Sequence, residues 1–341
     1  MSNHAPRIGI TRDLLTGTGA PAFGEAALAS LGGLAWEWIA EDVTEITPDI
    51  AARYDALCVN LPRVPAASVA RPDCRLRIVA RHGVGYDSVD VAALTRAGIV
   101  LTNTPAAVRR PVATSAVTYV LALAQKLRVK DQLTRSGQWN ARTDHMGRGL
   151  TGKVLGIVGA GSIGQETLRL ARVFDLRLLA ADPYVDAAAV AACGAELVPL
   201  DVLLQRADFV VLTCLLTEET RHLIGAAQLA LMKPTAYLIN VARGPIVDEA
   251  ALIAALRAGG IAGAGLDVFE QEPVDPANPL LAMANTIVSP HALCWTDECF
   301  DAIATSALSG IAAAMAGRRP RFVVNPEVLA APRVAAWLSA S

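Results

Sequence analysis

The chain has 341 residues, of which 53% are hydrophobic and 18% are charged, and its formal net charge is −2. This length is sufficient for two domains, each with its own core. The nearly neutral charge favours neither a nucleic-acid-binding surface nor a polybasic membrane patch. The six cysteines form no Cys-x-x-Cys pair and no zinc-binding spacing, so we expect reduced thiols and no metal site.

The sequence also lacks the signature of a targeting or membrane-spanning segment. Residues 1–6 are polar, and no apolar signal core follows them. The longest apolar stretch, around residues 113–124, contains Thr114, Ser115 and Thr118 and is too short to cross a bilayer. We therefore expect a cytoplasmic protein.

The first hundred residues alternate between strand and helix patterns. We predict strands at 7–11, 56–59, 78–80 and 99–101, and a helix at 25–31. This alternation predicts a parallel sheet with helices on its faces. A long helix is expected after Pro111, because apolar positions run from Val112 through Leu127 and proline suits the first turn of a helix.

A second α/β region begins near Lys153. Its strands are predicted at 154–158, 177–181, 209–212, 237–240, 265–268 and 286–288. A helix around 300–315 precedes 321–324, which is predicted as one more strand of a domain or as an exposed strand of a tail. The simplest organisation is a nucleotide-binding domain, 105–295, inserted into a smaller domain built from 1–104 and 296–341. The cleft between the two is the expected ligand site.

A glycine-rich turn directly follows the predicted strand 154–158. Gly159, Gly161 and Gly164 have the spacing Gly-x-Gly-x-x-Gly, and residues 165–173 have a helical pattern. In a Rossmann unit these glycines permit a tight turn, a close approach to a pyrophosphate and close packing of helix and strand. This context predicts a dinucleotide site, and the alternative is a glycine-rich turn in another kind of α/β protein.

The next predicted strand, 177–181, ends at Asp182. A Rossmann unit places an acid at about this position, where it binds the adenosine ribose. A carboxylate there accepts hydrogen bonds from the ribose hydroxyls and repels a 2′-phosphate. The sequence therefore predicts NAD rather than NADP as the cofactor.

Three polar residues follow predicted strands of the second region. Arg243, Glu272 and His291 come after the strands 237–240, 265–268 and 286–288. Ligands of open α/β sheets bind beyond the carboxyl ends of the strands, so we expect the three side chains to converge. A histidine beside a carboxylate exchanges a proton near neutral pH, and an arginine binds a carboxylate or carbonyl oxygen. Beside a nicotinamide, this set suits hydride transfer at a 2-hydroxy or 2-keto acid.

Several motifs together resemble the D-isomer-specific 2-hydroxyacid dehydrogenase family, which includes phosphoglycerate, glyoxylate/hydroxypyruvate and D-lactate dehydrogenases. The resemblance extends from about Arg7 to Pro326 and rests on residues 82–90, 103–105, 159–164, 240–244, 265–270, 272–273 and 289–291. It implies an NAD-dependent oxidoreductase that interconverts a D-2-hydroxy acid and its 2-keto acid. It also implies two Rossmann-like α/β domains with parallel sheets, the nucleotide domain inserted into a flavodoxin-like substrate domain, and a homodimer.

The resemblance implies a role for each matching residue. Arg243 would bind the substrate, His291 would be the general acid/base, and Glu272 would be its acidic partner. The backbone amides of Val84 and Gly85 would hold the substrate carboxylate. The implied cofactor positions, besides the three glycines, are Ser162 and Ile163 at the pyrophosphate, Asp182 at the ribose, and Cys214, Val241 and Asp267 at the nicotinamide.

The chain departs from the family pattern in ways that leave the substrate open. Ser162 and Leu215 stand where many relatives have Arg and Pro, and the run 292–298 replaces small residues. His82, Arg109, Arg110 and Trp295 are candidates for contacts with the substrate or for structural roles. An NAD-binding, corepressor-like interaction protein and a phosphite-type oxidiser on the same fold remain alternatives, whereas the acid at 272 disfavours a formate enzyme.

Overall fold

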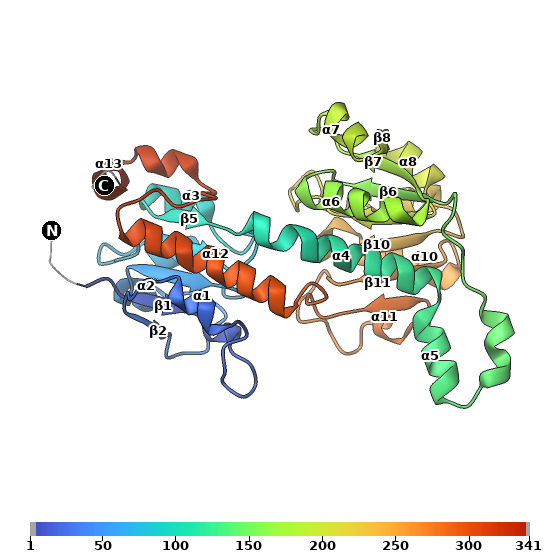
Figure 1. Cartoon of the computed structure of the whole chain (residues 1–341), viewed down its shortest axis with the longest axis horizontal. Coiled ribbons are helices and arrows are strands. Elements are labelled where there is room, and N and C mark those ends of the chain that lie inside the picture. Colours follow the sequence, from blue (N-terminus) through green and yellow to red (C-terminus); the bar gives the residue numbers. More distant parts are fainter. Residues whose placement is uncertain (1–4, 339–341) are drawn as a thin grey trace. The chain divides into compact units, whose positions relative to one another are not determined.

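The computed structural model describes residues 5–338, and this part of the chain divides into two compact units (Figure 1). Unit 1 contains the residues up to Val108 and those from Trp295 onward, and unit 2 is Arg109–Cys294. None of the helices within residues 5–338 combines the length and apolar character needed to cross a membrane.

Within the described residues, unit 1 is built on a five-stranded parallel sheet with the order β2-β1-β3-β4-β5. The strands are β1 (Ile8–Ile10), β2 (Trp36–Trp38), β3 (Ala56–Val59), β4 (Ile78–Arg81) and β5 (Val100–Thr102). The helices are α1 (Glu25–Ala29), α2 (Pro48–Arg53), α3 (Val91–Arg96), α12 (Asp297–Met315) and α13 (Pro332–Leu338), with 3-10 turns η1 (Arg12–Leu14), η2 (Ala66–Val69) and η6 (Pro326–Ala330).

Both faces of this sheet are buried, as is typical of parallel sheets. Successive residues of a strand point to opposite faces. In β3, Ala56 and Cys58 therefore pack in the core beneath α1 and α12, whereas Leu57 and Val59 pack in the core with α2 and α3.

Unit 2 contains, within the described chain, a seven-stranded parallel sheet with the order β12-β11-β10-β9-β6-β7-β8. Its strands are β6 (Val154–Val158), β7 (Arg177–Ala181), β8 (Ala195–Leu197), β9 (Phe209–Leu212), β10 (Tyr237–Asn240), β11 (Gly263–Leu266) and β12 (Thr286–Val288). The strand order reverses between β6 and β9, which is the position where doubly wound sheets bind ligands.

Helices cover both faces of the unit 2 sheet as well. They are α4 (Pro105–Ala124), which begins before the unit boundary, α5 (Leu127–Arg135), α6 (Ser162–Ala171), α7 (Ala187–Ala192), α8 (Leu200–Arg206), α9 (Ala226–Leu231), α10 (Glu249–Ala258) and α11 (Pro279–Ala282), with 3-10 turns η3 (Trp139–His145), η4 (Arg172–Phe174) and η5 (Gly244–Ile246). One core lies with α4 and α6, and the other lies with α8, α9 and α10.

The long helix starts earlier than the sequence predicts. Pro111 lies inside α4 and not in its first turn, because the helix begins at Pro105. Residues 106–110 are Ala-Ala-Val-Arg-Arg, and alanine and arginine are strong helix formers. Pro105 itself occupies the first turn, where proline is tolerated.

The strand predicted at 321–324 does not form. This segment makes only a single antiparallel bridge in the described structure, between Val323 and Thr102. Phe322 has a φ of 56°, which interrupts the extended conformation of a strand. The segment is held instead by Asn325, whose side chain is fully buried.

Asn325 replaces strand pairing with side-chain hydrogen bonds to β5 and its surroundings. Its Oδ1 accepts from the amide of Leu101 at 2.9 Å, and its Nδ2 donates to the carbonyl of Ile99 and to Thr95 Oγ1, each at 3.0 Å. These bonds, together with the backbone bond from the amide of Val324 to the carbonyl of Leu101 at 2.8 Å, hold the segment 321–325 beside β5.

The Asn325→Ala variant is expected to lose about 1–3 kcal/mol of stability, because it leaves buried polar partners without hydrogen bonds. The urea midpoint of the unit 1 transition measures the loss. Asn140→Ala changes an exposed asparagine in η3 and is the matched control, expected to stay within about 0.5 kcal/mol. Equal midpoints for the two variants would contradict the assigned role.

Candidate active site

A histidine and a glutamate form an ion pair beyond the ends of β11 and β12. His291 Nδ1 lies 2.7 Å from Glu272 Oε2. The other carboxylate oxygen of Glu272 accepts a hydrogen bond from the amide of Phe269 at 3.0 Å. The backbone of His291 is left-handed, with a φ of 54°, which turns its side chain out of the direction of β12.

The surroundings of Glu272 keep its carboxyl group ionised. Burial alone would raise its pKa, but the hydrogen bond and charge of His291 outweigh burial, and the Phe269 amide and the Arg243 guanidinium add to them. The pKa of Glu272 is therefore below its ordinary value.

Arg243 lies next to this pair because two turns pack tightly together. A Cβ at Gly244 would lie only 1.8 Å from the carbonyl oxygen of Phe269, so only glycine allows this approach. Asn240 Nδ2 donates to the carbonyl of Arg243 at 2.8 Å, and Arg243 Nη1 donates to the carbonyl of Ala242 at 2.7 Å. The structure thus brings together the three residues that the sequence predicts as catalytic.

The buried Asp267 organises the loop that carries His291. Its backbone carbonyl accepts from the amide of His291 at 2.7 Å. Its Oδ1 accepts from the amides of Ala292 and Leu293, at 2.9 and 3.1 Å, and from the hydroxyl of Ser289. Sequence comparison with the family implies only a nicotinamide contact for Asp267 and misses this structural role.

The glycine turn has the shape that a dinucleotide requires. Gly159 has a φ of 91°, and a Cβ there would lie 2.4 Å from the amide nitrogen of Cys214. A Cβ at Gly164 would lie 2.3 Å from the carbonyl oxygen of Gly159. At Gly161, by contrast, no heavy atom of the described residues, apart from its neighbours in the chain, lies within 4 Å of an added Cβ, so this side of the turn has room for a ligand.

The helix that follows the turn presents amide groups to that space. α6 begins at Ser162, and within the described chain no side chain caps its first turn. Uncapped amides at a helix N-terminus attract an anion such as a pyrophosphate. The start of α6, where the sequence predicts the pyrophosphate contacts of Ser162 and Ile163, is therefore suited to an anion.

Asp182 lies at the end of β7, beside the glycine turn. Its Oδ2 accepts from the amide of Ala160 at 2.8 Å, and its Oδ1 accepts from the amides of Tyr184 and Val185 at 2.8 and 3.2 Å. The carboxylate thus joins β7 to the turn. An ionised carboxylate has about four acceptor sites, so one remains for a ribose hydroxyl.

The two remaining cofactor positions lie at the ends of neighbouring strands. Cys214 follows β9, and burial raises the pKa of its thiol to about 11, so the thiol is neutral. Val241 directly follows β10 and is partly buried. Both residues line the same edge of the unit 2 sheet as Gly159.

Val84 and Gly85 belong to unit 1 and follow β4. The end of β5 holds this loop: Asn103 Nδ2 donates to the carbonyl of Val84 at 2.9 Å, and the amide of Gly83 donates to Thr104 Oγ1 at 3.2 Å. Asn103 and Thr104 lie in a motif of the sequence, yet their role as supports becomes visible only in the structure.

His82 is part of the unit 1 core. It is 4% exposed, and its ring lies 6.3 Å from that of Phe23 and 5.2 Å from that of Phe300. Burial, reinforced by the charge of Arg81, lowers the pKa of His82 to about 3. Trp295 extends the cluster, since its ring packs edge-on at 4.9 Å from Phe300.

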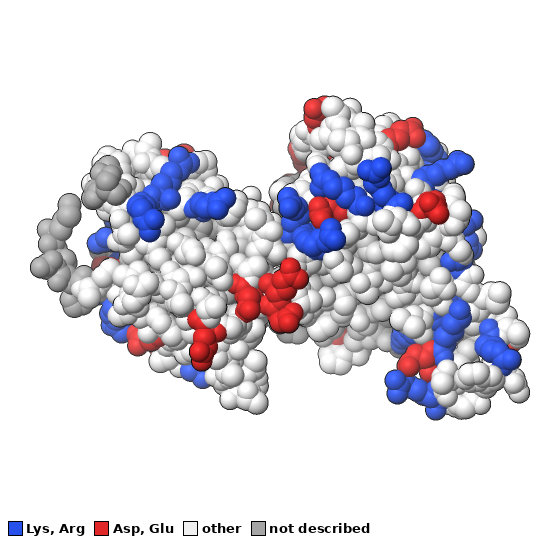
Figure 2. Space-filling model, viewed as in Figure 1, with Lys and Arg blue, Asp and Glu red and all other residues white. Residues whose placement is uncertain are grey.

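Arg110 contacts α6 in unit 2, where its Nη1 lies 2.7 Å from Glu166 Oε1. This hydrogen bond is the main reason that the pKa of Glu166 is lowered, and the nearby charge of Arg109 adds to it. Figure 2 shows basic side chains gathered on this face of unit 2, over α6 and the adjoining part of α4. No cluster of His, Cys, Asp or Glu suited to a metal ion occurs within residues 5–338.

Comparisons with known proteins agree with this geometry. A family model described as the NAD binding domain of D-isomer specific 2-hydroxyacid dehydrogenases matches residues 117–292. A glyoxylate reductase of Thermococcus gammatolerans is 44% identical over 300 residues, which are 86% of this chain and 90% of that protein. A glyoxylate reductase of Korarchaeum cryptofilum is 41% identical over 81% of this chain and 84% of that protein.

Among solved structures, a glyoxylate reductase from Paecilomyes thermophila aligns with a TM-score of 0.82 and 27% identity, covering 95% of this chain and all of that one (100%). A D-lactate dehydrogenase from Escherichia coli aligns with a TM-score of 0.77 and 26% identity over 93% of this chain and 99% of that one. The chain therefore belongs to the D-isomer specific 2-hydroxyacid dehydrogenase family.

Proposed function

We propose that the protein reduces glyoxylate, or a 2-keto acid of similar size, with NADH. The reaction class, an NAD-dependent interconversion of a 2-hydroxy acid and a 2-keto acid, follows from membership of the family. The name glyoxylate reductase, borne by relatives at 41–44% identity, supports the choice of substrate. The observation that carries the chemistry is the 2.7 Å contact between His291 and Glu272.

In this proposal His291 is the general acid of keto-acid reduction. The ionised Glu272 can only accept, so Nδ1–H of His291 donates to it, and Nε2 is the nitrogen that we assign to proton transfer. Bound NADH supplies the hydride to the keto carbon. His291 donates its proton to the keto oxygen in this direction and removes the hydroxyl proton in the reverse direction. This retained acid–base pair favours an enzyme over an interaction protein on the same fold.

We assign substrate binding to Arg243 and to the loop at Val84 and Gly85. A guanidinium presents a planar set of donors that matches a carboxylate and a neighbouring carbonyl oxygen. The backbone amides of Val84 and Gly85 would bind the carboxylate, on a loop that Asn103 holds at the end of β5. Residues 1–104 and 296–341 would then form the substrate domain, and 105–295 the NAD-binding domain.

We assign the cofactor to the glycine turn and the strand ends beside it. The space at Gly161 and the uncapped start of α6 support a pyrophosphate site. Asp182 would bind the adenosine ribose through its remaining acceptor site. The proposed nicotinamide contacts are Cys214, Val241 and Asp267.

We further propose a cytoplasmic homodimer. The cysteines are free, which suits a reducing compartment. None of the residues of α5 in the described structure is buried, and its first residue, Leu127, is 60% exposed. In the segment that follows α5, Trp139 and Met146 are 62% and 73% exposed. Exposed apolar side chains grouped in this way are typical of a surface that binds another protein chain.

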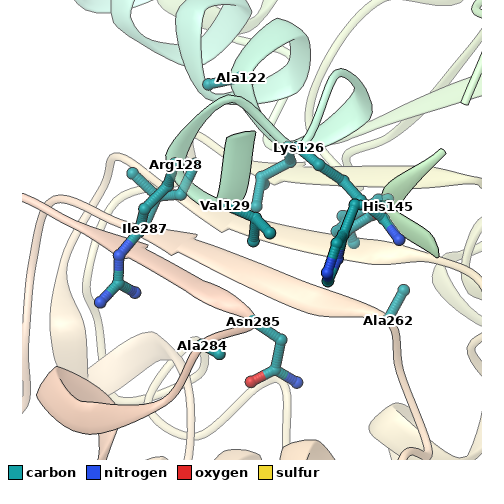
Figure 3. Close-up of a pocket in the computed structure, with 11 residues that line it drawn as sticks. Ala122, Lys126, Arg128, Val129, His145, Ala262, Ala284, Asn285 and Ile287 are labelled. Atoms are coloured by element: carbon teal, nitrogen blue, oxygen red, sulfur yellow. The ribbon is translucent and has the colours of Figure 1, made fainter. Parts of the chain in front are cut away.

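The segment 127–146 of unit 2, which contains α5 and η3, borders a pocket. The pocket measures about 230 Å³ and opens between α4, α5, η3 and the strands β10 and β12. Figure 3 shows Lys126, Val129, His145, Asn285 and Ile287 among the side chains that surround it. We propose that a second copy of the chain covers the segment 127–146. Sedimentation equilibrium, which measures the mass of the assembly in solution, tests this proposal.

A panel of 2-keto acids with NADH, followed by absorbance of the reduced nicotinamide, tests the proposed function. Glyoxylate is expected to give the highest kcat/KM. His291→Asn is expected to lower kcat about 10²–10⁴-fold, because it removes the general acid. The control is His222→Asn, which removes the other His–Glu pair of unit 2, between His222 and Glu270 at 2.7 Å. Folded wild-type protein that oxidises NADH with no member of the panel would overturn the proposal.

Glu272→Gln tests the electrostatic role of the carboxylate. Glutamine keeps the size of the side chain but removes the negative charge that accepts from His291 Nδ1. The variant is therefore expected to lower kcat about tenfold or more, because a charged acceptor forms the stronger hydrogen bond and holds the imidazole in place. A wild-type kcat in Glu272→Gln would show that the carboxylate does not support His291.

Asp182→Asn tests the cofactor preference. Wild-type protein is expected to have a higher kcat/KM with NADH than with NADPH, because the carboxylate repels a 2′-phosphate. Removing the charge should reduce this ratio about tenfold or more, the effect of one lost charge contact of ~1.4 kcal/mol. Asp186→Asn, which alters the N-cap of α7, is the control. A wild-type preference for NADPH would contradict the assignment.

A further inference from the structure

A buried chain of hydrogen bonds connects α4 to the loop that carries His291. Tyr119, on α4, is 2% exposed, and its hydroxyl lies 2.6 Å from Ser289 Oγ. Ser289 Oγ in turn lies 2.5 Å from Asp267 Oδ1, and Asp267 is 4% exposed. The same Oδ1 accepts from the amides of the two residues that follow His291, at 2.9 and 3.1 Å.

The direction of each hydrogen bond in this chain is determined. Ser289 has one hydroxyl proton, and the carboxylate of Asp267 can only accept it. The hydroxyl of Tyr119 must therefore donate to Ser289 Oγ. Burial raises the pKa of Tyr119 above its ordinary value, so the phenol keeps the proton that it donates.

The ring of Tyr119 is fixed by the sheet. A Cβ at Gly265 on β11 would lie 2.6 Å from Tyr119 Cδ1, so the ring lies directly against this strand. Gly265 precedes Asp267 by two residues, so one strand positions both ends of the hydrogen-bonded chain. The hydroxyl consequently reaches Ser289, just after β12, at a fixed point.

The loop that Asp267 holds contains a residue in an unfavourable backbone conformation. His291 is left-handed, with a φ of 54°, a conformation that costs a non-glycine residue about 1 kcal/mol or more. Asp267 offsets this cost through the amides of residues 291–293. Ser289 and Tyr119 then determine where the accepting oxygen of Asp267 lies.

We propose that Tyr119 and Ser289 are positioning residues, which act through Asp267 to set the distance between His291 and Glu272. This inference rests on the proposed role of His291 as the general acid. It assigns to the long helix α4 a part in the chemistry, although Tyr119 itself contacts neither Glu272 nor His291 in any described hydrogen bond.

Tyr119→Phe removes the hydroxyl and keeps the ring. We expect kcat for keto-acid reduction to fall about tenfold with little change in the KM for NADH, because sub-ångström to 1 Å displacements of reacting groups cost up to about 10²-fold. The separation of kcat from KM is the readout, because a displaced His291 impairs proton transfer and leaves the NADH site unchanged. A purely structural role would lower the melting temperature without this selective fall in kcat.

Two further variants complete the test. Ser289→Ala should lower kcat about as much as Tyr119→Phe. The double variant should have a kcat no lower than that of Ser289→Ala alone, because both substitutions interrupt the same series of hydrogen bonds. Ser289→Thr keeps a hydroxyl and should restore most of kcat. Tyr237→Phe removes the hydroxyl of another tyrosine of this unit, whose ring is stacked on Phe209, and should leave kcat unchanged.

The outcomes separate this inference from the proposed function. A wild-type kcat in both Tyr119→Phe and Ser289→Ala, with His291→Asn inactive, would overturn the positioning role alone. Additive losses in the double variant would also overturn it. Full activity of His291→Asn would overturn the assignment of the general acid, and the positioning role with it.

Discussion

The site depends on the parallel register of three neighbouring strands. Asn240 of β10 pairs with Leu266 of β11, which pairs with Val288 of β12, so the strands end at the same level of the sheet. The residues that follow them therefore meet at one edge. Gly244 permits the turn after β10 to touch the turn after β11, and the left-handed backbone at 291 brings the imidazole back to Glu272. The imidazole, the carboxylate and the guanidinium lie together because these positions share one edge.

Central strands could be predicted from the sequence because their patterns are local. The bounds of β6, β7, β9 and β10 agree with those predicted, since each is a short apolar run between turn residues. The strands β2 and β8 are not predicted, because each has only three residues with an exposed glutamate at its centre and so lacks an apolar run. The edge strands β5 and β12 are predicted, because each consists mainly of apolar residues. Asn325 illustrates a second reason why prediction from local patterns fails. Its side chain forms hydrogen bonds with the backbone of Ile99 and Leu101, which are far away in the sequence, and these bonds take the place of strand pairing at 321–324.

The candidate site could likewise be predicted only in part. The sequence indicates which residues follow strands, and this suffices to place His291 beside Glu272. It does not indicate what holds them. In the sequence, Tyr119 cannot be distinguished from the other core residues of an apolar helix. Its hydrogen-bond partner, Ser289, is 170 positions away in the chain, so no local pattern connects the two. Asp267 likewise matches a cofactor position, whereas its three contacts with the loop depend on the tertiary fold.

The left-handed backbone at His291 affects how mutagenesis at this position is interpreted. Histidine, asparagine and aspartate tolerate positive φ better than most residues, whereas alanine and β-branched residues resist it. An alanine scan would remove the imidazole and also favour a different loop path, so a lost rate would mix two causes. Asparagine keeps the torsional preference and isolates the contribution of the ring. The choice of replacement side chain thus decides whether kinetics report chemistry or main-chain geometry.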